Sequence, residues 1–130
     1  MKKKIFSGNF IVRCGVYPFD VMFSVGEGDD ELNNVLVKYG LDGEMELCRY
    51  SSDRSWGNCC MFDSGAIMVR LRGVPVDGFG YGVLAHEIYH AGMYLMDRIG
   101  IKIELGVSDE ALAYVIQYLH EKFWEGVRGE

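Results

Sequence analysis

The first half of the chain alternates apolar and polar positions with the period of β-strands. Residues 9–14 and 19–25 are rich in β-branched and aromatic side chains, and Pro18 lies in the segment between them. This pattern predicts a β-hairpin. In its second strand, every other residue from Phe19 to Val25 is apolar and is expected to face the core.

A second hairpin is predicted by residues 58–62 and 66–72, which flank a turn sequence at 63–65. The later strand precedes a helical segment. Its Arg70 or Arg72 could bind a substrate carboxylate, or could be a solvated edge charge that prevents sheet-to-sheet aggregation.

Three segments carry apolar residues at helical spacing. The first spans residues 28–39, starts with acidic residues that favour a helix N-terminus, and ends at Gly40. The others are expected from about 81 to 99 and from 108 to about 125, with Gly92 allowing these two helices to pack closely and antiparallel. The whole pattern predicts an α+β fold, in which a small antiparallel or mixed sheet carries both long helices on one face.

Two segments give weaker signals. Charged residues interrupt the apolar positions of 41–56, where 45–50 is expected to form a further strand. Trp56 could line a substrate cleft or could simply cover the edge of the core. The segment 74–82 contains Pro75 and three glycines, and we expect a flexible loop there that could act as a lid.

Composition narrows the class of protein. A chain of 130 residues with 49% hydrophobic residues predicts one domain over residues 1–130. The net charge of -6 disfavours nucleic-acid and acidic membrane partners, and no segment is long enough to cross a bilayer. The cysteines lack paired spacing, which predicts reduced thiols in a cytoplasmic protein, although an even number also permits a disulfide. They are Cys14, Cys48, Cys59 and Cys60.

The candidate chemistry is concentrated in the sequence His86-Glu87-x-x-His90. Residues four apart lie on nearly the same face of a helix, so both histidines can bind one ion about 2 Å from each nitrogen. Glu87 would lie beside that ion and accept a proton from a metal-bound water. Glu110 is the candidate third ligand, because it follows the predicted N-cap Ser108, where the helix dipole keeps a carboxylate ionised.

The pattern of His86, Glu87, His90 and Glu110 resembles that of the gluzincin branch of the zincin metallopeptidases. Residues 108–114 also resemble the glutamate helix of small bacterial and phage zincins. The resemblance covers about the second half of the chain. Zincins of this kind have an edge strand just before the motif helix and bind the substrate backbone along it, so the resemblance implies this role for residues 66–72. It implies a Zn²⁺-dependent metallopeptidase that hydrolyses a peptide or amide bond by glutamate-assisted attack of a zinc-bound water on a peptide or protein substrate.

The sequence also departs from the thermolysin-like pattern. Tyr114 stands where those enzymes have an aspartate bonded to a zinc histidine, so another residue must orient the histidine here. Tyr114 is nevertheless the favoured donor to a transition-state oxyanion, because it lies one turn from the candidate glutamate ligand. Tyr81, Tyr89 and Tyr94 are alternatives for this role. His120 is expected to have a packing or surface role.

An alternative function is a catalytically inactive zincin-like domain that serves as a binding module or phage accessory protein. The short chain motivates this alternative, because 130 residues leave little length for deep specificity pockets. The sequence does not determine the substrate or the oligomeric state.

Overall fold

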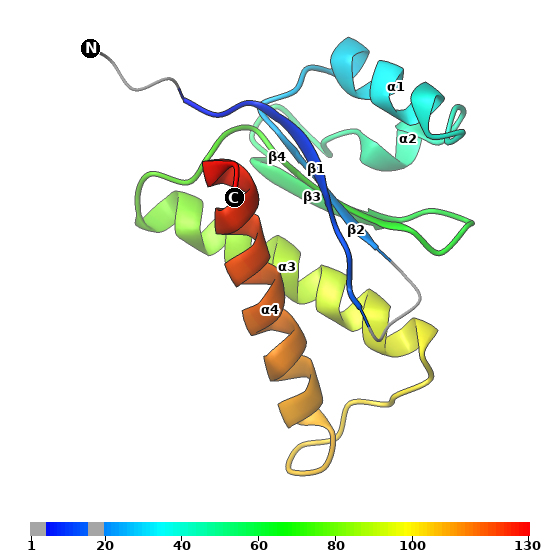
Figure 1. The fold of residues 1–130 in the computed structure, drawn as a ribbon, viewed down its shortest axis with the longest axis vertical. Coiled ribbons are helices and arrows are strands. Elements are labelled where there is room, and N and C mark those ends of the chain that lie inside the picture. Colours follow the sequence, from blue (N-terminus) through cyan, green and yellow to red (C-terminus); the bar gives the residue numbers. More distant parts are fainter. Residues whose placement is uncertain (1–4, 16–19) are drawn as a thin grey trace.

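The computed structural model describes residues 5–15 and 20–130, which form a mixed β-sheet with helices on both faces (Figure 1). The strands are β1 (Gly8–Val12), β2 (Val21–Val25), β3 (Gly57–Met61) and β4 (Ile67–Leu71). The helices are α1 (Asp29–Lys38), α2 (Met45–Cys48), α3 (Gly78–Arg98) and α4 (Asp109–Arg128). The predicted α+β class, with its mixed sheet, is confirmed.

The strand order is β1-β2-β4-β3, with the parallel pair β2 and β4 at the centre. β1 pairs antiparallel with β2, and β3 pairs antiparallel with β4, so both predicted hairpin pairings are confirmed. Residues 16–19, which include Pro18 and Phe19, lie outside the described residues. The prediction that 66–72 forms an edge strand is wrong, because β2 occupies the other side of β4. The edge beside α3 belongs to β3 instead.

Both faces of the central strands are buried, because the sheet lies between two pairs of helices. The face with Val21, Phe23 and Val25 packs against α3 and α4, as predicted for the two long helices. The opposite face, with Met22 and Met68, packs against the smaller helices α1 and α2. No helix in the described chain combines the length and apolar character needed to cross a bilayer.

α3 begins at Gly78, within the segment 74–82 that was predicted to be a loop. The side chain of Asp77 accepts a hydrogen bond from the backbone N–H of Gly80 at 2.9 Å. This N-cap satisfies one of the free amides of the first turn and compensates for the low helix propensity of its glycines. The predicted loop therefore ends at the N-cap, and the residues that follow are part of a rigid helix.

The strand expected at 45–50 is also a wrong prediction, because α2 lies there instead. Met45 and Cys48 are three residues apart, which places both on the buried side of this short helix. The Sγ atom of Cys48 lies 3.8 Å from that of Cys60 on β3, and both cysteines are free thiols. The thiols of Cys48 and Cys60 therefore form part of the contact between α2 and the sheet.

Arg70 of β4 is buried, with 2% of its surface exposed, and does not form the solvated edge charge that was predicted. Its guanidinium donates hydrogen bonds to the carbonyl oxygens of Cys48 and Glu27 and to Asp29 Oδ1. The ring of Tyr50 lies 4.3 Å from the guanidinium carbon. Because β4 is central, Arg70 links α1, α2 and the sheet rather than binding a ligand at an edge.

We expect Asp29→Asn to lower the free energy of unfolding at neutral pH by about 1–2 kcal/mol. The loss is smaller than for a fully buried ion pair, because the Asp29 side chain is 50% exposed. The hydrogen bond from Arg70 lowers the pKa of Asp29. The interaction of Asp29 with Arg70 therefore stabilises the fold fully above the unfolded-state pKa of Asp29, about 3.9. This stabilisation is lost as the pH falls through the lower pKa that Asp29 has in the folded state.

Urea denaturation of both proteins between pH 7 and pH 3 measures this difference. Asp30→Asn is the matched control, because Asp30 lies in the same first helical turn while Arg70 bonds to Asp29. Equal destabilisation by the two variants would mean that the helix dipole, not the ion pair with Arg70, accounts for the effect.

Candidate metal centre

His86 and His90 project from the exposed flank of α3, whose buried face is formed by Leu84, Ile88 and other apolar residues. Their Nε2 atoms lie 3.2 Å apart. Two nitrogens bound to a tetrahedral zinc at about 2.0–2.1 Å are separated by roughly 3.3 Å. The spacing of the two rings therefore fits joint binding of one ion.

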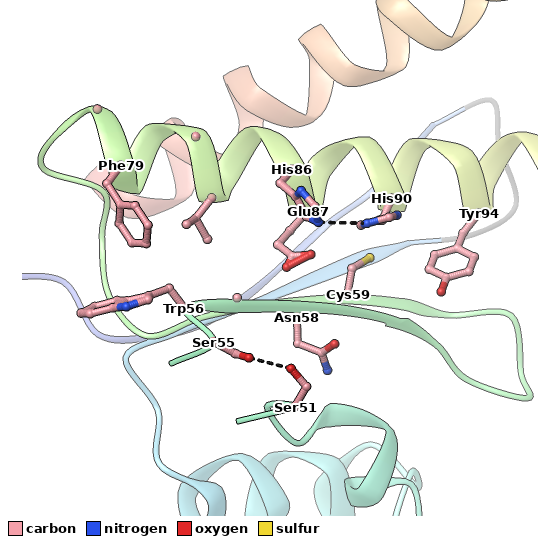
Figure 2. Close-up of a pocket in the computed structure, with 14 residues that line it drawn as sticks. Ser51, Ser55, Trp56, Asn58, Cys59, Phe79, His86, Glu87, His90 and Tyr94 are labelled. Atoms are coloured by element: carbon pink, nitrogen blue, oxygen red, sulfur yellow. Dashed lines mark hydrogen bonds between the residues drawn. The ribbon is translucent and has the colours of Figure 1, made fainter. Parts of the chain in front are cut away.

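Glu87 lies beside the histidines but is buried, with 6% of its surface exposed. One potential ligand atom from each of His86, Glu87 and His90 can be chosen such that all lie within 4.8 Å of one another. Burial raises the pKa of Glu87, while the two neighbouring histidines oppose this shift. Figure 2 shows the carboxylate in the space between α3 and β3.

Gly57, the first residue of β3, allows this carboxylate to lie against the strand. A Cβ atom at position 57 would be 2.8 Å from Glu87 Cγ, 2.9 Å from Glu87 Oε2 and 2.9 Å from Val83 Cγ1. Real Cβ atoms are almost never found at such distances, so a side chain at this position would force the side chains of Glu87 and Val83, or the elements that carry them, to shift. The absence of a side chain at Gly57 therefore positions Glu87.

His86, Glu87 and His90 line a cleft of about 640 Å³ between α3, β3 and the loop 51–56 (Figure 2). Its walls include Trp56, Cys59, Phe79 and Tyr94. The Arg72 side chain donates hydrogen bonds to the carbonyl oxygens of two serines in the loop 51–56. Trp56 therefore lines a cleft, which was one of its two predicted roles, and Arg72 is engaged in holding the adjacent loop.

Tyr94 is the candidate oxyanion donor that the structure brings to the cleft. Burial raises the pKa of its hydroxyl, so it remains protonated and able to donate a hydrogen bond. Tyr114, the donor favoured from the sequence, lies on α4 with 65% of its surface exposed and does not line the cleft. Tyr81 and Tyr89 are exposed and also lie outside the cleft lining.

Glu110 is not brought to the two histidines in the described structure. It is an exposed residue of α4 and belongs neither to the compact ligand group nor to the cleft lining. α4 crosses α3 obliquely, on the face where a Cβ at Gly92 would contact Leu112 Cδ1 at 3.0 Å (Figure 1).

Glu110 lies apart from the ligand group because His86 and His90 point to a different side of α3 from Gly92, where α4 packs. At about 100° per residue, His90 and His86 lie about 160° and 120° around α3 from the Gly92 position. α4 packs at that position, so the histidines project away from it. His120, also on α4, is half-buried and has its Nδ1 atom 2.9 Å from the carbonyl oxygen of Ile116.

Several cleft residues could not be identified from the sequence, namely Gly57, Asn58, Cys59 and Phe79. Their place depends on β3 being the edge strand and on α3 beginning at Gly78. The available signal was the Asp77-x-x-Gly80 spacing of an N-cap, which predicts a helix start that brings Phe79 to the cleft.

The fold and site together define an α+β domain with a candidate metal centre on a helix beside an edge strand. No family model, curated protein or solved structure matches the chain. The resemblance to zincins consequently stays a prediction from the motif residues.

We expect Gly57→Ala to lower the free energy of unfolding by about 1–3 kcal/mol, as overpacking in a core does. The added methyl group would overlap with Glu87 and Val83. Gly82→Ala is the matched control, since Gly82 lines the same cleft but has open space around it. That variant should be neutral or more stable by up to about 1 kcal/mol, because alanine favours a helix. Chemical denaturation that shows equal effects would contradict the positioning role of Gly57.

Proposed function

We propose that the protein is a zinc-dependent hydrolase that cleaves a peptide or amide bond. The observation that supports this most strongly is the histidine pair, with Nε2 atoms 3.2 Å apart, beside the buried carboxylate of Glu87. These groups meet in an open cleft rather than in a closed core. An open cleft leaves access for a substrate, which a purely structural metal site does not need.

His86 and His90 would hold the ion, which would polarise a substrate carbonyl and lower the pKa of a water molecule. Glu87 would accept the proton of the attacking water and pass it to the leaving amine. Its position against Gly57 fixes the carboxylate and limits its contact with solvent. Tyr94 would donate a hydrogen bond to the oxygen on which negative charge develops.

A peptide or protein is the substrate class that the shape of the cleft favours. Strand β3 lies at the edge of the sheet, pairs only with β4 among the described strands, and contributes residues to one wall of the cleft. An extended peptide could pair with such an edge through main-chain hydrogen bonds. In this proposal β3 has the role that was predicted for residues 66–72. The cytoplasm remains the predicted location, because the cysteine spacing is typical of reduced thiols.

A binding module without catalysis is the second candidate. The placement of Glu110 favours it, because two histidines and the general base form an incomplete set of ligands for catalytic zinc. In that case the cleft would bind a peptide without cleaving it. Measurement of zinc binding and of cleavage in the same preparations separates the two candidates.

We expect the purified protein to bind about one zinc ion per chain, measured by elemental analysis and by isothermal titration calorimetry. His86→Ala and His90→Ala should each weaken zinc binding by at least about 100-fold, because each removes half of the histidine pair. His120→Ala is the control and should leave the affinity unchanged. Wild-type protein that binds no zinc, even when zinc is supplied, would contradict the proposed metal centre.

Glu110→Ala extends the same measurement. The position of Glu110 outside the ligand group predicts that zinc affinity changes by less than about threefold. A loss of about tenfold or more would show instead that the first turn of α4 reaches the ion in the zinc-bound protein. The three-ligand set expected from the sequence would then be restored.

We expect Glu87→Gln to keep zinc affinity within about threefold and to lower the rate of peptide cleavage by about 10²–10⁴-fold. Glutamine preserves the size of the side chain but cannot accept the proton. Cleavage of a mixture of unstructured peptides is measured by mass spectrometry, with Glu121→Gln on the surface of α4 as the control. Undiminished cleavage by Glu87→Gln would contradict the mechanism, and absence of cleavage by a zinc-loaded wild type would favour the binding module.

A further inference from the structure

A second, smaller cavity of about 230 Å³ adjoins the cleft of the candidate metal centre. Trp56, Phe79 and Val83 line both spaces. Val83 is three residues before His86 on α3, so the junction of the two spaces lies about one helical turn from the histidine pair. The small cavity therefore shares part of its wall with the site at which hydrolysis is proposed.

The walls of this cavity are mainly apolar, and we refer to it as the apolar pocket. Beyond the three shared residues, its apolar side chains are Leu71, Val74, Pro75 and Val76. Asp77 is the one charged residue among the described lining residues, and its Oδ1 accepts the hydrogen bond of the α3 N-cap from Gly80. Because the rest of the wall is mainly apolar, an apolar group fits the pocket best.

Two aromatic side chains stand at the junction with unusually large exposure. Trp56 is 52% exposed and Phe79 is 62% exposed, and their rings meet edge to face with centroids 5.9 Å apart. Exposed aromatic groups that flank a concave apolar surface are typical of binding sites, because a ligand recovers their burial energy. Phe79 belongs to the capped first turn of α3, and Trp56 is the loop residue that directly precedes β3.

The pocket is preformed by close packing of the segment before α3. A Cβ atom at Gly80 would lie 3.0 Å from the Cα atom of Pro75, so this turn of α3 lies against the chain that forms the opposite wall. The volume is below the roughly 300–1,000 Å³ of pockets that hold a complete small molecule. It fits one large side chain, with the rest of the ligand lying in the adjoining cleft.

We propose that the apolar pocket receives a large apolar side chain of a peptide substrate, such as phenylalanine or leucine, adjacent to the bond held at the metal centre. Trp56 and Phe79 determine this preference by forming the walls on either side of the junction. This inference rests on the proposed peptide hydrolysis, because it names the side chain that such a substrate carries beside the scissile bond.

Binding of two small probes to zinc-loaded protein tests the pocket without any need for cleavage. The probes are N-acetyl-phenylalanine amide and N-acetyl-alanine amide, titrated while backbone amide resonances are followed by NMR. We expect the phenylalanine probe to bind at least about tenfold more tightly and to shift the amides of Gly73, Val74 and Gly80. The amide of Gly100, at the far end of α3, should not move.

Trp56→Ala and Phe79→Ala should each reduce the preference for the phenylalanine probe by about tenfold, with zinc affinity unchanged. Tyr39→Ala is the matched control, because Tyr39 is an exposed aromatic residue that lines neither space. Equal binding of both probes, or resonance shifts that exclude the pocket amides, would overturn the proposal. Self-association that Trp56→Ala abolishes would also overturn it, since the aromatic pair would then be covered by a second copy of the chain.

Failure of the pocket can be separated from failure of the proposed function. Protein that prefers the phenylalanine probe but cleaves no peptide would refute the hydrolase and leave the pocket as part of a binding module. Protein that cleaves peptides equally well beside small and large apolar residues would refute the pocket alone.

Discussion

The close approach of α3 to the backbone of β3 at Gly57 is the constraint on which the candidate centre depends. A side chain at that position would occupy the volume that Glu87 and Val83 fill. Since Glu87 is enclosed there, the adjoining flank of the helix presents His86 and His90 to the cleft. The ligand group consequently comes from a single helix braced on a strand, and elements of this kind hold side chains more accurately than loops do.

Local patterns in the sequence predict most of the elements. The alternation in residues 19–25 and 66–72 indicates strands, and the helical spacing before and after Gly100 indicates helices. Alternation does not report burial here, because both faces of β2 and β4 are buried. The proximity of His86, Glu87 and His90 follows from helix geometry alone, and the structure brings them together as expected. The sequence did not determine the position of Trp56, by contrast, because this residue could either line a cleft or cover the edge of the core.

The edge of the sheet and the place of Glu110 both depend on how segments distant in the sequence meet. β4 is central because β2 pairs beside it, and no local pattern in residues 66–72 distinguishes a central strand with a buried arginine from an edge strand with an exposed one. The placement of Glu110 depends on how α4 crosses α3 at Gly92, which is set by side-chain packing between the helices. Spacing along the chain gives the distance between two residues in sequence, but it does not give the rotation of one helix about another.

The parallel pairing of β2 with β4 also affects the order in which the molecule can assemble. This pairing joins two antiparallel hairpins that are distant in the sequence, and a long loop must close before its contacts form. Isolated two-stranded hairpins are marginal in water, so neither half provides a stable base for α3. Strand β2 contributes no residue to the cleft lining, yet the cleft depends on it, because β2 joins the two halves of the sheet on which α3 packs.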